Sequence, residues 1–121
     1  MVEQNREESE NNVVSLKAAI AAGVRIAMGT DAGGPLNRHG ENAEELVHMV
    51  RAGMSPMQAI VAATRNAAEC VGLADRVGTL EPGKFADLLV VSEDPLRDIS
   101  VLTRREQIYL VLKGGSPVGY R

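Results

Sequence analysis

A helix, a glycine, a short apolar run and a glycine-rich loop follow one another between residues 10 and 35. Apolar residues recur at helical spacing over residues 10–22, and Gly23 then predicts the end of that helix. Residues 24–28 are largely apolar and predict a buried strand, which leads into a loop of Gly, Thr, Asp and Pro at residues 29–35. This order is typical of a parallel α/β unit, so the sequence predicts an α/β fold.

Two more helices are predicted in the middle of the chain. Asn42 is the expected N-cap of the first, which carries acidic residues in its first turn. The second has a clearer start, because Ser55 can cap it, Pro56 takes the first helical position and Gln58 completes a capping box. Its apolar spacing predicts one continuous helix that ends at Gly72.

The pattern changes in the last third of the chain, where no helix of similar quality follows. The sequence Glu-Pro-Gly-Lys at residues 81–84 predicts a type II turn, and residues 86–91 and 108–112 predict two strands. We therefore divide the chain into an α/β segment, residues 1–73, and a β-rich segment, residues 74–121.

Composition narrows the classes of function. The 121 residues carry a formal net charge of −3, which argues against a nucleic-acid partner because such proteins present a basic face. The sequence holds neither an apolar run of about 18 residues nor a basic and apolar leader, so we expect no membrane span and no secretory signal. The single cysteine, Cys70, cannot form an internal disulfide, and we expect a cytoplasmic protein.

Asp31 is the residue best placed for chemistry. It follows the carboxyl end of the predicted buried strand, where α/β folds place their working groups. A carboxylate there can bind a metal ion or accept a proton from a metal-bound water, although it can equally cap a turn. His39 follows beside Gly40, where it can contact a substrate carboxylate or a metal, or simply face solvent.

The number of metal-binding side chains is small. A catalytic zinc ion takes about three protein ligands from His, Asp, Glu or Cys. The chain has 2 His and 1 Cys, and it contains no His-x-His, His-Glu-x-x-His or Cys-x-x-Cys pattern. His48 suits a helix-surface or packing position better than a ligand position, and Cys70 is expected to be a small core residue. We therefore expect that this chain alone cannot build a conventional catalytic metal site.

Five segments follow one another along the chain: GVRIAMGTDAG at 23–33, His39-Gly40 with Glu44-Glu45-Leu46, GMSPMQAI at 53–60, ATRNAAE at 63–69 and GTLEPGKFADLLVV at 78–91. In this order they resemble the metal-dependent amidohydrolase superfamily, and most closely its imidazolonepropionase and Xaa-Pro or Xaa-Arg dipeptidase branch. The first segment is similar to the superfamily's last barrel strand and catalytic loop, and the last is similar to its C-terminal signature.

The resemblance implies the C-terminal fragment of a (β/α)8 TIM barrel with part of its small β-sandwich domain. Residues 1–73 would be the last βα units of the barrel, and residues 74–121 the last strands of the sandwich. It further implies that Asp31 is catalytic and binds a divalent metal, zinc, and that it passes the proton of the attacking water to the leaving nitrogen. His39 matches a loop histidine near the substrate, which would be a small amide, cyclic amide or dipeptide hydrolysed at a C–N bond.

The resemblance covers only part of such an enzyme. A complete barrel of this type needs about 250 residues, and the superfamily's other metal ligands have no counterpart in this sequence. We therefore expect the isolated chain to be inactive. Exposed strand edges and apolar faces favour pairing with another chain, so we expect self-association or a complementing polypeptide.

Two functions of other classes remain open. The chain can be a non-catalytic assembly module that pairs through open sheet edges, in which case it needs no metal and Asp31 is replaceable. It can also be a small domain that binds an anion at the N-terminus of the second predicted helix. Glu41, Glu44 and Glu45 disfavour the anion site, since they already occupy that positive potential.

Overall fold

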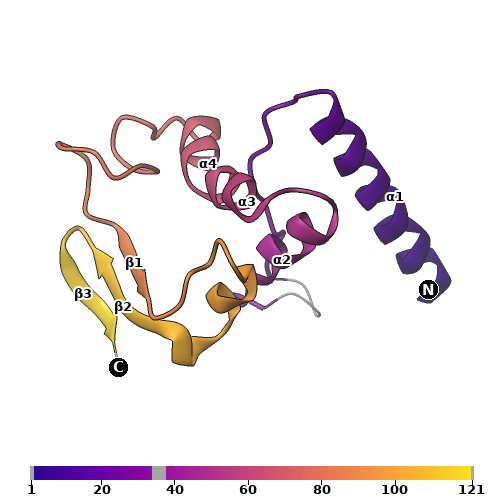
Figure 1. The fold of residues 1–121 in the computed structure, drawn as a ribbon. Coiled ribbons are helices and arrows are strands. Elements are labelled where there is room, and N and C mark those ends of the chain that lie inside the picture. Colours follow the sequence, from indigo (N-terminus) through magenta and orange to yellow (C-terminus); the bar gives the residue numbers. More distant parts are fainter. Residues whose placement is uncertain (1, 34–37, 121) are drawn as a thin grey trace.

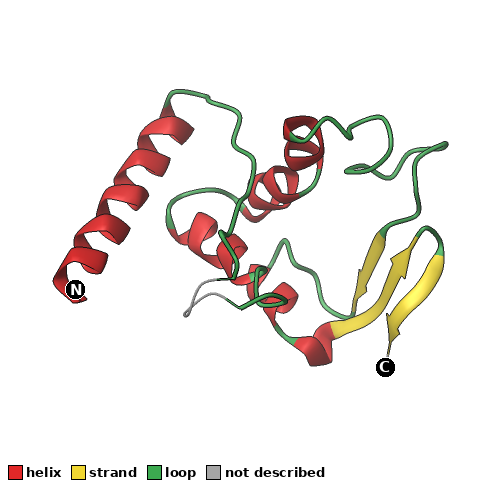
Figure 2. Ribbon diagram, turned by 180° about the vertical axis from the view of Figure 1, so that it is seen from behind, coloured by secondary structure: helices red, strands yellow, loops and turns green. Residues whose placement is uncertain are grey.

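The computed structural model describes residues 2–33 and 38–120. Helices come first, and an antiparallel sheet forms the C-terminal part (Figures 1 and 2). The α-helices are α1 Val2–Ala21, α2 Glu44–Arg51, α3 Pro56–Ala63 and α4 Arg65–Cys70; the strands are β1 Leu88–Val91, β2 Ile108–Lys113 and β3 Ser116–Tyr120; and the 3-10 helices η1 Ile99–Thr103 and η2 Arg105–Gln107 lie between β1 and β2. These described residues form an α/β fragment that does not close a barrel by itself.

The first helix is longer than its apolar spacing indicated. α1 begins at Val2, whereas the pattern supported only its C-terminal part. Its end is confirmed, because Gly23 has a φ of 70° and the N–H groups of Gly23 and Val24 donate back to the last turn at 3.0 Å. Leu16 and Ile20 pack against the core. No helix in the described part of the chain is long and apolar enough to cross a membrane.

Residues 24–28 do not form the predicted strand. They have no ladder partner within the described residues, and a strand exists only through the hydrogen bonds of such a ladder. Instead, the N–H of Met28 donates to the carbonyl of Ala62 in α3 at 3.0 Å. Ile26 and Met28 still pack against the core, as their apolar character predicted. The lack of a neighbouring strand agrees with the expectation that this chain supplies only part of a larger sheet, whereas the strand itself did not form.

The core lies where α2, α3 and η1 meet. Ala59 and Ala62 are fully buried, and their short side chains let the elements approach one another closely. Because only 2% of the residues are aromatic, methionine and aliphatic side chains fill the remaining space. The buried members of this cluster are Leu46, Met49, Met54, Ala59, Ala62 and Ile99.

α2 begins without the predicted asparagine cap. Ala43, not Asn42, occupies the N-cap, and no side chain caps the helix. A turn before the helix takes over that role, because the Glu44 N–H donates to the Glu41 carbonyl at 3.1 Å and the Glu45 N–H to the Asn42 carbonyl at 3.3 Å. The prediction was wrong because backbone carbonyls satisfy the first N–H groups that a side chain would otherwise serve.

The capping box at the start of α3 is confirmed, but the helix that follows is broken. The Gln58 N–H donates to Ser55 Oγ at 3.2 Å, and the Ser55 N–H donates to Gln58 Oε1 at 2.8 Å. The predicted single helix is interrupted at Thr64, whose φ and ψ are −118° and −87°. The Thr64 hydroxyl donates to the Ile60 carbonyl at 2.7 Å, and such bonds to the preceding turn compete with the helical N–H.

The two predicted strands are confirmed as β1 and β2, and they pair with each other. The sheet order is β1-β2-β3, with both pairs antiparallel. Gly114 and Gly115 have φ values of 56° and 83° and connect β2 to β3 in a two-residue turn that suits the twist of a hairpin. β3 was not predicted because its Pro117 and Gly119 are poor strand formers.

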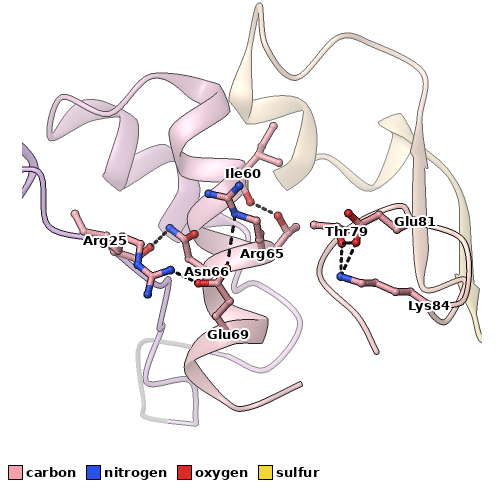
Figure 3. A network of polar contacts seen from close by, with 10 residues as sticks. Arg25, Ile60, Arg65, Asn66, Glu69, Thr79, Glu81 and Lys84 are labelled. Carbon is pink, nitrogen blue, oxygen red and sulfur yellow. Dashed lines mark hydrogen bonds and ion pairs between the residues drawn. The ribbon is translucent and has the colours of Figure 1, made fainter. Parts of the chain in front are cut away.

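The predicted turn at residues 81–84 is confirmed and carries a small polar cluster (Figure 3). Gly83 has a φ of 92°, and the Lys84 N–H donates to the Glu81 carbonyl at 3.2 Å. The Lys84 ammonium group contacts Thr79 Oγ1 at 2.5 Å and Glu81 Oε2 at 2.8 Å. The hydrogen bonds from Lys84 and Thr79 hold the pKa of Glu81 below its usual value.

Candidate functional site

Asp31 lies in the loop that follows residues 24–28, and its backbone is distinctive. Its φ of 49° makes it the one non-glycine residue in the described part of the chain with a positive φ. Asp and Asn adopt this left-handed conformation more readily than other side-chain-bearing residues, because their short polar side chains bond locally. The Asp31 side chain is exposed. The loop therefore presents a carboxylate to solvent from a backbone conformation that few residue types accept.

His39 lies close to this loop. A Cβ built on Gly33 would be 3.2 Å from Nε2 of His39, so the imidazole sits against the backbone only two residues after Asp31. Gly33 has a φ of 120° and no side chain, which leaves room for the ring. Gly34 and Pro35 of the predicted loop lie outside the described residues. The structure thus brings both predicted site residues to one loop, while their chemical roles stay predictions.

The described residues do not form a complete metal site. In residues 2–33 and 38–120, no group of three or more His, Cys, Asp and Glu side chains is arranged to hold a metal ion. His48 is exposed on α2. Cys70 is exposed at the end of α4, so the prediction that it is a core residue was wrong. Asp31 therefore belongs to no such group, and a catalytic zinc ion takes about three protein ligands. A metal centre at Asp31 would need further ligands from outside the described residues.

Side chains of α4 fasten the segment that leads to Asp31 (Figure 3). Asn66 Nδ2 donates to the carbonyl of Ile26 at 2.9 Å, although the residues are 40 positions apart. On the outer surface, Arg25 pairs with the carboxylate of Glu69, which also lies 4.0 Å from the Arg65 guanidinium. These contacts hold a segment that has no strand neighbour among the described residues.

These anchoring residues were not predicted from the sequence. One signal was available, because asparagine in a helix costs stability relative to alanine and usually has a local reason. Asn66 stands in α4 with such a reason, its bond to Ile26. The partner itself could not be identified, since nothing local links residues 26 and 66.

The chain is similar to known proteins in sequence and in structure. The family model described as "Amidohydrolase family" matches residues 1–118. Ochratoxinase of Aspergillus niger is 41% identical over 111 residues, which cover 88% of this chain and 22% of the relative. Imidazolonepropionase of Geobacillus kaustophilus is 35% identical over 105 residues, which cover 82% of this chain and 24% of the relative.

A solved structure shows the same fold. A crystal structure of a Xaa-Pro dipeptidase with bound methionine in its active site superposes with a TM-score of 0.78 at 42% identity, covering 87% of this chain and 25% of that one. The chain thus spans about a quarter of the length of the relatives that it matches. Since the family model matches almost the whole sequence, this chain belongs to the amidohydrolase family.

Proposed function

We propose that this chain forms the Asp31-bearing part of a hydrolase that cleaves C–N bonds in small amides, cyclic amides or dipeptides. Membership of the amidohydrolase family is the observation that carries the proposal. The exposed carboxylate of Asp31 on a left-handed turn supports it, because a general acid or base must reach its substrate. His39, beside Gly33, is proposed to contact the substrate.

We propose that Asp31 is also one ligand of a divalent metal, zinc, in the complete enzyme. A divalent ion there would supply an activated water and charge stabilisation at the substrate carbonyl. The described residues hold no group of three or more possible ligands for a metal ion, so we propose that the remaining ligands come from outside them. In this proposal, Asp31 holds its carboxylate at the reacting centre.

The surface supports association with more protein. An apolar groove of about 810 Å³ separates the helices from β1, and its lining includes Ile60, Val71, Leu80 and Leu89. Leu80 is 80% exposed and Val71 is 68% exposed. Apolar patches of this kind mark interaction surfaces or aggregation-prone surfaces. We propose that the groove is covered by a complementing polypeptide or by another copy of this chain.

The isolated chain is expected to show no turnover. The assay uses purified chain, added Zn²⁺ and a panel of dipeptides and lactams, with Zn²⁺ alone as the control. Since a single carboxylate cannot hold a catalytic zinc ion, the two rates should be equal. Turnover by the chain alone, above the Zn²⁺ control, would refute the proposal that the other metal ligands come from outside this chain.

Native mass spectrometry tests the association. We expect oligomers of the chain, and we expect Leu80→Asp to shift them toward the monomer because it places a charge in the apolar groove. Val14→Asp is the matched control, since Val14 is 65% exposed on α1 and does not line the groove. A cooperatively folded monomer would count against the proposal. An assembly that forms without metal, and whose subunit number and stability are the same in Asp31→Asn, would favour the non-catalytic module.

A further inference from the structure

We propose that Asn66 is the positioning residue of the Asp31 loop. Its amide Nδ2 donates to the carbonyl of Ile26 at 2.9 Å in a partly buried contact. Ile26 lies in the segment that leads directly into the Asp31 turn. The chemical meaning of this position rests on the function proposed for Asp31, whereas the anchoring itself does not.

The hydrogen bonds that α3 and α4 make to this segment take the place of those from a neighbouring strand. In an extended chain, the carbonyl of one residue and the N–H of the second residue after it point to the same edge. The Ile26 carbonyl accepts from Asn66 in α4, and the Met28 N–H donates to the Ala62 carbonyl in α3 at 3.0 Å. The helical pair therefore supplies a donor to Ile26 and an acceptor to Met28, as a neighbouring strand would, in a segment that has no strand partner among the described residues.

The surface ion pairs contribute less to this anchor. Arg25 pairs with Glu69, but the Arg25 side chain is 75% exposed. Arg65 is also exposed and lies 4.0 Å from Glu69. Solvent screens such pairs and their side chains lose entropy in forming them, so their net contribution is small. The Asn66 amide is the directional contact that lies away from solvent.

Stability alone is a poor explanation for an amide at this position. The second polar atom of the side chain, Asn66 Oδ1, is buried and has no hydrogen-bond partner within the described residues. An unpaired buried acceptor lowers stability, and an apolar side chain of similar shape avoids that cost. What the amide provides, and an apolar side chain does not, is a fixed orientation of the Ile26 carbonyl and of the loop behind it.

Amide hydrogen exchange of the full ¹⁵N-labelled chain tests the proposal. In Asn66→Leu, the Met28 N–H should exchange about fivefold to tenfold faster, as expected for loss of one supporting hydrogen bond. The resonances from Gly29 to Ala32 should shift, while the helical amides and the thermal midpoint stay as in the wild type. Asn42→Leu is the control, because Asn42 is exposed and precedes α2. Unchanged exchange at Met28, or equal loss of protection in every helix, would overturn the proposal.

Asn66→Asp provides a rescue. An ionised carboxylate cannot donate to the Ile26 carbonyl, so at neutral pH this variant should behave like Asn66→Leu. Below the ordinary aspartate pKa of about 3.9, the protonated carboxyl is a donor again, and protection of Met28 should return toward the wild-type value at the same pH. Asn66→Leu should show no such return. Failure of the rescue while both variants release the segment would overturn the donor role.

The test separates this inference from the proposed function. Asp31→Asn should leave the exchange rate at Met28 unchanged, because Asp31 takes no part in the anchor. A protein in which Asp31 proves catalytically irrelevant but Asn66 controls Met28 exchange would refute the hydrolase proposal alone. If Asp31 proves catalytic but Asn66→Leu leaves Met28 exchange unchanged, only the anchoring role of Asn66 is refuted.

Discussion

Gly78→Ala is expected to lower the free energy of unfolding by about 2–5 kcal/mol, combining overpacking with a left-handed backbone that alanine disfavours. A Cβ on Gly78 would lie 2.5 Å from the Ala68 Cβ, 3.0 Å from the Thr64 carbonyl oxygen and 3.3 Å from the Arg65 Cα. Two of these atoms belong to the backbone and cannot rotate away. The φ of 93° at Gly78 adds strain of its own.

Gly83→Ala is the matched control for this variant. Gly83 has nearly the same φ, 92°, but nothing lies within 4 Å of a Cβ built on it. Its substitution should therefore cost only the backbone term, about 1–2 kcal/mol. Urea unfolding followed by far-ultraviolet circular dichroism gives both values. Equal losses in the two variants would show that the close approach of Gly78 to the break between α3 and α4 does not exist in solution.

Local features of the fold were predictable because the residues that determine them are neighbours in sequence. The Ser55–Gln58 capping box involves two residues three positions apart, and its two hydrogen bonds formed as predicted. Gly23 and the turn at residues 81–84 depend on similarly short stretches. β1 and β2 followed from similarly local patterns, whereas the parallel α/β unit expected around residues 24–28 did not form within the described residues.

Features that depend on distant partners were not predictable in the same way. The apolar period runs without interruption past Thr64, so it cannot reveal a break against which Gly78 packs. Residues 24–28 have the composition of a strand, yet strand assignment requires a neighbour that the described residues do not supply. β3 exists because two glycines fold it back on β2, despite its own weak strand pattern.

The residues of the candidate site also differ in how far the sequence could predict them. Asp31 was selected because it follows an apolar run in a glycine-rich loop, and its positive φ gives a structural reason for Asp at that point. His39 was selected from sequence position, and its ring indeed lies against Gly33. Asn66 was missed because its contact with Ile26 joins residues 40 positions apart.

Asp31→Asn is expected to reduce kcat by roughly 10²–10⁴-fold, the usual contribution of a positioned acid or base. The measurement needs an active enzyme reconstituted from this chain and a polypeptide that supplies the other three-quarters of the family fold. Asparagine also tolerates the left-handed conformation found here, so the loop should keep its shape while the carboxylate is lost. An unchanged kcat would remove Asp31 from the reaction.

Two further variants test whether the fall in kcat is caused by loss of the Asp31 carboxylate. Glu41→Gln removes another exposed carboxylate shortly before α2 and should leave kcat unchanged, because Glu41 is not at the Asp31 turn. His39→Asn should raise KM more than it lowers kcat if His39 contacts the substrate without transferring a proton. Equal falls in kcat for Asp31→Asn and Glu41→Gln would indicate a general effect of surface charge. A fall confined to Asp31→Asn, with the circular dichroism spectrum unchanged, would assign the chemistry to the one side chain that the left-handed turn presents.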